Sequence, residues 1–224
     1  MFLIFGIRGR LSVIGSGTFH CGRCGGDRSY VVEGIRRWFT FFFIPVFPIS
    51  GILSRRVRCT SCHGLYDPGV LEIPTSDAMA DLVSRAFRQS AVAILKAGDP
   101  NSAVARSSAV ANIEEFYQGA YRYDSETLEG DLGEADASHL SIYVSPIANR
   151  VGTEGAELSV ARCAQIALAD GSLTGGEEDA LRVLGESFNL SSAHLSGIIS
   201  QVTPMKEPAA ESPSSHDDEG PVER

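Results

Sequence analysis

The chain has 224 residues and a formal net charge of −9, and its length suits one medium domain or two small ones. The charge is divided unevenly, with a net +6 in residues 1–70, −11 in residues 71–202 and −4 in residues 203–224. This asymmetry argues against one uniform domain and predicts different partners for different parts of the chain.

The first residues do not follow the pattern of a secretory signal. The apolar segment at residues 1–7 is too short for the core of a signal peptide, and Arg8 and Arg10 follow it rather than precede it. We therefore expect a cytoplasmic protein. In such a reducing compartment cysteines are metal ligands more often than disulfides.

Four of the five cysteines form two C-x-x-C pairs, Cys21 with Cys24 and Cys59 with Cys62. A two-residue spacer lets one tight turn direct two thiolates at one ion, so the pairs predict a tetrahedral Zn²⁺ site. Because protein fills all four positions, we expect a structural rather than a catalytic zinc ion. Two alternatives stay open: disulfides or a redox C-x-x-C, and replacement of one cysteine by a neighbouring histidine, His20 or His63.

Residues 38–49, between the two cysteine pairs, are almost wholly apolar. The run is shorter than the ~20 residues of a membrane-spanning helix, and Pro45 and Pro48 interrupt it. Its aromatic and β-branched content predicts strands, with neighbouring strands at 28–35 and 54–60. We expect residues 1–72 to form a β zinc ribbon that is too small to enclose all its phenylalanines.

Three interpretations of this aromatic run stay open. The favoured one is packing against the following domain or against a second copy of the chain. The second is shallow insertion into an anionic surface at the inner face of the membrane, and the third is nucleic-acid binding. The surface concerned comprises Arg36, Arg37, Trp38, Phe41, Phe42, Phe43, Arg55, Arg56 and Arg58.

Residues 73–202 have helical periodicity, which predicts an all-α bundle joined by short loops. In the first predicted helix an apolar stripe extends from Met79 to Leu95, and Asp99 is predicted to cap a second helix with Pro100 at its first position. Further helices are predicted within 124–138, 139–151 and, three of them, within 155–202. The tail, residues 203–224, is rich in proline, serine and acids and is predicted to be disordered.

The segment ALADGSLTGGEEDAL, residues 167–181, separates two of these helices. Thr174 and Glu177 fit a T-x-x-E capping box, and Ser191 is predicted to cap the last helix. Asp170 with Gly171, then an apolar residue and Glu177, resemble the signature of TerB-like domains, the all-helical domains of tellurite-resistance proteins. The N-terminal part is similar to the zinc ribbon often fused ahead of such domains.

The resemblance implies a stress-response and interaction protein whose acidic bundle binds a protein partner. It also implies that Asp170 and Glu177 bind a second divalent cation such as Ca²⁺. The chain departs from the family where an earlier acidic motif is expected, because it has Gly98 and Asp99 in place of Asp-Gly and Ala105 in place of the acid. The local interpretation, an aspartate in a turn and a glutamate in a capping box, stays open.

Catalytic patterns such as G-x-S-x-G, H-E-x-x-H and the phosphate-binding loop do not occur in the sequence. We therefore expect a protein that is not an enzyme, and the sequence identifies no small-molecule substrate. Cys163 lies on an apolar helical face and is expected to be buried. The expected fold class is α+β multidomain: a β zinc ribbon (1–72), an all-α TerB-like bundle (73–202) and a disordered acidic tail (203–224).

Overall fold

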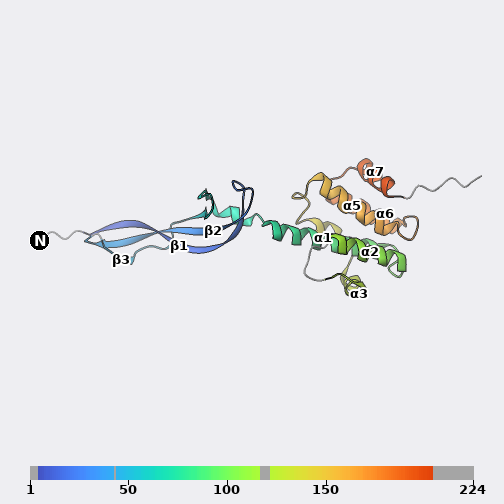
Figure 1. Cartoon of the computed structure of the whole chain (residues 1–224), viewed down its shortest axis with the longest axis horizontal. Coiled ribbons are helices and arrows are strands. Elements are labelled where there is room, and N and C mark those ends of the chain that lie inside the picture. Colours follow the sequence, from blue (N-terminus) through green and yellow to red (C-terminus); the bar gives the residue numbers. More distant parts are fainter. Residues whose placement is uncertain (1–4, 43, 117–121, 204–224) are drawn as a thin grey trace, which may run out of the picture.

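The computed structural model describes residues 5–42, 44–116 and 122–203, and it consists of an antiparallel sheet followed by helices (Figure 1). The predicted α+β order is therefore confirmed. Phe43 and residues 204–224, which include nearly all of the predicted disordered tail, lie outside the described residues.

The sheet is built around one long hairpin, as its extended shape in Figure 1 shows. The two hairpin strands pair from Phe5↔Phe41 to Cys21↔Gly26. The second hairpin strand, β2 (Gly26–Phe41), pairs along its other edge with β4 (Ser54–Cys59) over residues 30–35 and with β3 (Ile44–Pro48) over residues 38–41. The strands predicted at 28–35 and 54–60 are therefore confirmed. The strands are β1 Phe5–Cys21, β2 Gly26–Phe41, β3 Ile44–Pro48, β4 Ser54–Cys59 and β5 Leu65–Tyr66.

A β-bulge divides β1 into an outer half and an inner half. The register shifts between Val13, which pairs with Glu33, and Gly15, which pairs with Val32. Since side chains alternate between the two faces of a strand, the extra residue moves the odd-numbered side chains of β1 to the other face of the sheet. The apolar side chains of the outer and inner halves therefore lie on opposite faces.

The inner half of the ribbon has a very small core. Its buried apolar residues are Phe19, Cys21, Val57 and Cys59, and Tyr30 and Tyr66 pack against them. Phe19 meets both tyrosine rings edge to face, with ring centroids 5.5 Å apart in each case. Two of the four buried residues are cysteines, so apolar burial alone offers this sheet little stability.

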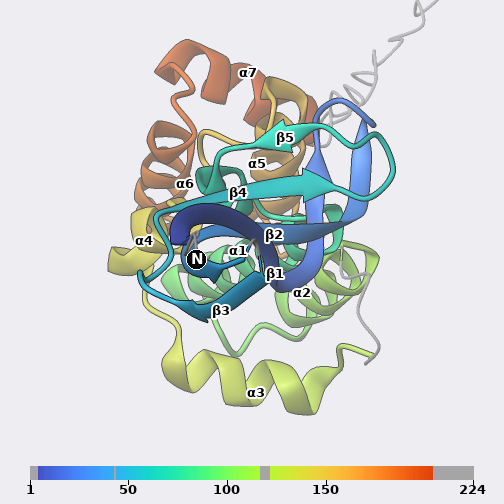
Figure 2. The ribbon, with the colours of Figure 1, turned by 90° about the vertical axis from the view of Figure 1, so that its left-hand side faces the viewer.

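The helical part has its own, much larger core of 28 buried apolar residues. Helix α1 contacts α2, α4, α5 and α6, and Figure 2 views this part along the ribbon. The helices are α1 Ser76–Ala97, α2 Ala103–Phe116, α3 Ser125–Glu134, α4 Leu140–Val144, α5 Thr153–Ala167, α6 Gly175–Ser187 and α7 Ser192–Val202, with 3₁₀ turns at Pro68–Glu72 and Ala137–His139. Within the described residues, no helix has the length and apolar character needed to cross a membrane.

Most of the predicted helices are confirmed, and one predicted start is wrong. The second helix begins at Ala103, not at Pro100, and the Ser102 Oγ accepts a hydrogen bond from the Ala105 N–H at 3.2 Å. Asp99 instead accepts from the Asn101 N–H at 2.9 Å and closes a turn. Both side chains can cap a helix, and the turn at Pro100 moves the start to the second of them.

Candidate metal centre

The four cysteines of the two C-x-x-C pairs meet at the base of the ribbon. Cys21 and Cys59 end β1 and β4, and Cys24 and Cys62 lie in the turns that follow. The two turns are alike: the N–H of Gly25 donates to the carbonyl of Cys21, and that of His63 to the carbonyl of Cys59. Gly25 and His63 both have left-handed backbones, with φ of 66° and 56°.

The spacing of the sulfur atoms fits a tetrahedral ion. All four Sγ atoms lie within 4.8 Å of one another, and those of Cys21 and Cys62 are 3.8 Å apart. With zinc–sulfur bonds of about 2.3 Å, the edge of a tetrahedron of sulfurs is about 3.8 Å. All four are free thiols in the structure, and within the described residues they are the single group of three or more His, Cys, Asp or Glu ligand atoms close enough to share an ion. The cluster could therefore hold a metal ion.

Hydrogen bonds lower the pKa of two of the four thiols, Cys21 and Cys62, and so favour the thiolate form that binds a cation. The Tyr66 hydroxyl donates to Cys21 Sγ at 3.1 Å and lowers the pKa of Cys21 to about 6. The Gly64 N–H, 3.4 Å from Cys62 Sγ, lowers the pKa of Cys62. Burial, together with the neighbouring sulfurs, raises the pKa of Cys24 to about 12. A bound divalent cation would stabilise the Cys24 thiolate against both effects.

The two histidines beside the cysteines lie outside the cluster. The Nδ1 of His20 lies 3.2 Å from Asp27 Oδ1, and the second oxygen of Asp27 accepts from the N–H of Ser76 at the start of α1 at 2.8 Å. His63 is exposed. His20 thus belongs to the junction between the ribbon and the helices.

Tyr66 is a residue of the site that the sequence did not predict. We expect Tyr66→Phe to weaken metal binding on the order of 10-fold. The substitution keeps the ring against Phe19 but removes the hydroxyl donor, so the pKa of Cys21 rises and metal binding must displace one more proton. The loss should therefore be largest between about pH 6 and 8 and shrink above about pH 9. Competition with a chelator across this pH range measures it, and an unchanged affinity would contradict a role for the hydroxyl.

At the predicted second cation site, the Glu177 carboxylate is hydrogen-bonded to its near neighbour Thr174. Glu177 is 3% exposed, and its Oε2 accepts from the N–H and the hydroxyl of Thr174, both at 2.8 Å. The predicted capping box is confirmed. Asp170 is exposed in the preceding turn. Cation binding by Asp170 and Glu177 stays a prediction.

The residues predicted to form a basic and aromatic surface separate into two places. Arg56 and Arg58 form ion pairs with Glu33 at 2.8 and 2.6 Å, near the inner half of the ribbon. Trp38 and the described phenylalanines lie in the outer half, where Phe41 and Phe42 are 40% and 48% exposed. The described part of the aromatic run is thus exposed in the single chain rather than packed on the helical bundle. The second-copy, membrane and nucleic-acid interpretations stay open.

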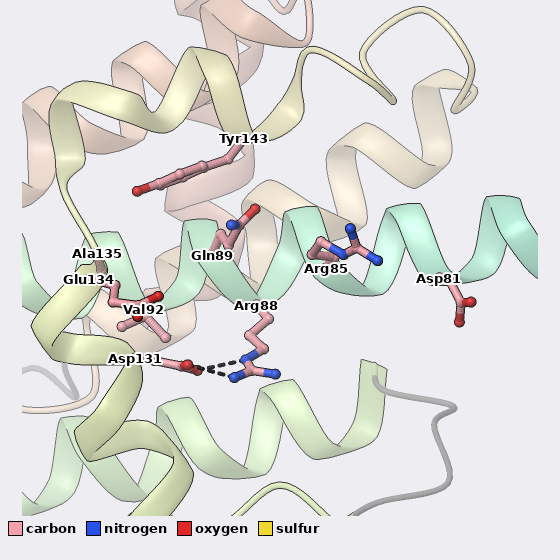
Figure 3. Close-up of a pocket in the computed structure, with 9 residues that line it drawn as sticks. All are labelled: Asp81, Arg85, Arg88, Gln89, Val92, Asp131, Glu134, Ala135 and Tyr143. Carbon is pink, nitrogen blue, oxygen red and sulfur yellow. Dashed lines mark hydrogen bonds and ion pairs between the residues drawn. The ribbon is translucent and has the colours of Figure 1, made fainter.

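A pocket of about 580 Å³ lies along α1 in the helical part (Figure 3). Charged side chains line much of it: Asp81, Arg85 and Arg88 from α1, and Asp131 and Glu134 from α3. Figure 3 shows Arg88 turned toward Asp131, across the pocket from Tyr143.

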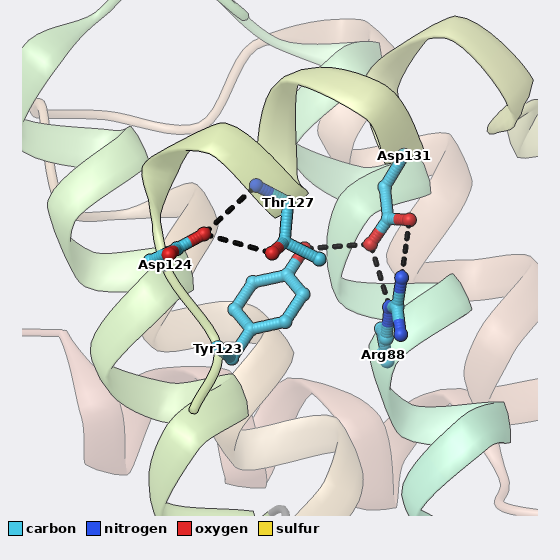
Figure 4. Close-up of polar contacts among 5 residues, drawn as sticks. All are labelled: Arg88, Tyr123, Asp124, Thr127 and Asp131. Atoms are coloured by element: carbon cyan, nitrogen blue, oxygen red, sulfur yellow. Dashed lines mark hydrogen bonds and ion pairs between the residues drawn. The ribbon is translucent and has the colours of Figure 1, made fainter. Parts of the chain in front are cut away.

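Two of the charged side chains at this pocket, Arg88 and Asp131, pair with each other (Figure 4). Arg88 donates to both oxygens of Asp131 at 2.6 and 2.5 Å, and the Tyr123 hydroxyl donates to the same carboxylate at 2.7 Å. Burial raises the pKa of Tyr123, so the hydroxyl stays protonated. Asp124 caps α3 through Thr127. We interpret the network as a link that fixes α3 against α1.

Comparison with known proteins adds no relative. No family model, curated protein or solved structure matches the chain. The likeness to TerB-like domains therefore depends on the sequence pattern given above.

Proposed function

We propose that this chain is a non-enzymatic interaction protein whose long β-ribbon is stabilised by one structural zinc ion. The observation that carries the proposal is the cluster of Cys21, Cys24, Cys59 and Cys62, with sulfurs within 4.8 Å of one another. Four thiolates leave no position for water or substrate, which supports a structural ion. The small core around the cluster supports the need for such an ion, since four apolar residues are buried there in the part of the ribbon that the structure describes.

The shape of the ribbon supports a role in contact with a partner. The metal cluster lies at its inner end, while exposed apolar side chains gather at the outer end, away from the helices (Figure 1). A metal-bound inner end would hold the outer half in one orientation, so that the ribbon loses little conformational entropy when it binds a partner. The acidic helical bundle is a second surface for a protein partner.

The TerB-like motif supports a narrower proposal, a role in tellurite or stress resistance with a divalent cation at Asp170 and Glu177. Two carboxylates are few for Ca²⁺, which takes about six to eight oxygen ligands. Calorimetric titration of the full chain with Ca²⁺, beside the Asp170→Ala variant, tests the cation. Heat in the unsubstituted chain that the variant loses would support the site, and no heat in either would remove it.

A photoreactive amino acid at position 47, in the outer half of the ribbon, tests the interaction role in cells. We expect cross-links to a cellular protein or lipid from this position, and far fewer from position 142, an apolar position on α4 that is even more exposed. Combining the position-47 probe with Cys59→Ser should abolish the cross-links because the ribbon loses its base. Equal yields from positions 47 and 142, or cross-links that survive Cys59→Ser, would contradict the proposal.

A further inference from the structure

We propose that the outer half of the ribbon docks on a membrane surface rich in anionic lipid, with its apolar face in the lipid. The inference rests on the proposed function and names the partner of the same ribbon. The outer half comprises residues 5–13 of β1, residues 33–41 of β2, and β3. It differs from the surface predicted from sequence, because Arg8 and Arg10 belong to it and Arg56 and Arg58 do not.

One face of this outer half is largely apolar on all three strands, and its charged members are Arg37, the partner of Gly9, and Glu33, the partner of Val13. Cross-strand partners share a face of a sheet, and Phe5 and Ile44 are both partners of Phe41, as Ile7 and Phe47 are of Phe39. Phe39 and Phe47 also stack, with ring centroids 5.2 Å apart. The exposed apolar members of this face are Phe5, Ile7, Leu11, Val13, Phe41, Ile44 and Phe47.

This apolar face is large for a protein in water. Its seven exposed apolar members are between 40% and 70% accessible. Together they present on the order of 700 Å² of apolar surface, above the few hundred Å² of an ordinary surface patch. Such a surface is expected to have a partner.

The opposite face of the outer half carries arginines that face one another. Arg10 is the direct cross-strand partner of Arg36, and Arg8 is the partner of Trp38. Like charges in this position destabilise a sheet. Within the described residues, Arg10 and Arg36 have no carboxylate in ion-pair range, and neither has Arg37, which is the cross-strand partner of Gly9 and lies on the apolar face. An anionic partner would supply acceptors for these side chains.

The outer half thus has an apolar face on one side and arginines with Trp38 on the other. This distribution is typical of elements that lie in the membrane interface. Long arginine side chains reach around such an element to the headgroups while the apolar face enters the lipid. The edges of the sheet carry unpaired backbone groups that need water, so we expect shallow docking rather than insertion into the hydrocarbon core.

The charge layout of the whole chain agrees with an anionic surface. Residues 1–70 carry a net charge of +6, while residues 71–202 carry −11. The 17 residues of β1 extend over about 55 Å, which holds the acidic helices well beyond the screening length of about 8 Å (Figure 1). Repulsion between the acidic bundle and anionic headgroups is therefore small.

Vesicle flotation of the full zinc-loaded chain tests the proposal. We expect it to float with vesicles of phosphatidylcholine and phosphatidylserine, less with phosphatidylcholine alone, and less as salt rises. Replacing Arg10 and Arg36 by Gln should weaken binding to the anionic vesicles about 30-fold. Replacing Phe41 and Phe47 by Ser should weaken it on the order of 100-fold.

The matched control is Ile142→Ser, which removes a comparably exposed apolar side chain from the helical part and should leave flotation unchanged. A zinc content equal to that of the unsubstituted chain verifies that each variant keeps its ribbon.

Absence of flotation, or flotation of the Phe41 and Phe47 variant equal to that of the unsubstituted chain, would overturn the proposal. A chain that sediments as a dimer through this face without floating would do so too, and would identify a second copy as the occupant. Cross-links from position 47 to protein alone would keep the proposed function and reject the membrane.

Discussion

Cys59→Ser is expected to unfold the ribbon and to leave the helical part folded. The substitution removes one of four thiolates, and structural zinc sites of this kind contribute on the order of 10 kcal/mol to folding. Among the described residues of the ribbon, four apolar ones are buried in its core and Cys59 is one of them, so little holds the sheet together once the ion is lost. The helical core has 28 buried apolar residues of its own and does not depend on the ion.

Amide hydrogen exchange distinguishes the two parts of the chain in this variant. We expect loss of protection in β1, β2 and β4 together with loss of zinc, while α1, α5 and α6 stay protected. The control is Cys163→Ala, which changes the fifth cysteine, buried in the helical core, and should keep both the zinc and the protection of the ribbon. Unchanged protection of the ribbon in zinc-free Cys59→Ser would show that the sheet is stable without metal.

Gly176→Ala is expected to lower the free energy of unfolding of the helical part by about 2–3 kcal/mol. Gly176 lies in the first turn of α6, where an added Cβ would come 2.5 Å from the carbonyl oxygen of Ala97 at the end of α1. A backbone atom cannot turn aside as a flexible side chain can, so the two helices must move apart. In a helix free of such contacts, the same substitution would stabilise by up to about 1 kcal/mol.

Gly175→Ala is the matched control because it lies in the same turn. An added Cβ at Gly175 meets nothing within 4 Å, and we expect this variant to be as stable as the unsubstituted chain or slightly more stable. Thermal and denaturant unfolding followed by the helical signal compares the two. Equal stability of the two variants would show that the second glycine of the TGGEE segment is not needed for the close approach of α1 and α6.

Local patterns in the sequence were sufficient to predict much of this fold. The C-x-x-C pairs place two thiolates at one turn each, and the T-x-x-E pattern of Thr174 and Glu177 closes within one helical turn. Asp99 and Ser102 show the limit of this reasoning. Both fit a helix cap, and only the course of the turn at Pro100 selects Ser102.

Features that depend on strand register could not be predicted. Glu33 pairs with Arg56 and Arg58 because β2 and β4 align them across 23 and 25 residues of sequence. The bulge between Val13 and Gly15 decides on which face of the sheet the apolar side chains of β1 lie. Gly15 is a residue type found at bulges, but glycine also occurs in turns and regular strands, so it does not fix the shift. Tyr66 reaches Cys21 from a two-residue strand, which leaves no periodic signal in the sequence.

Metal analysis of the full chain, purified without added metal, tests the central claim most directly. We predict one zinc ion per chain, bound in proportion to protein and absent from Cys59→Ser. Protein that contains no zinc while its ribbon is folded, or whose four cysteines are joined in disulfides, would contradict the account.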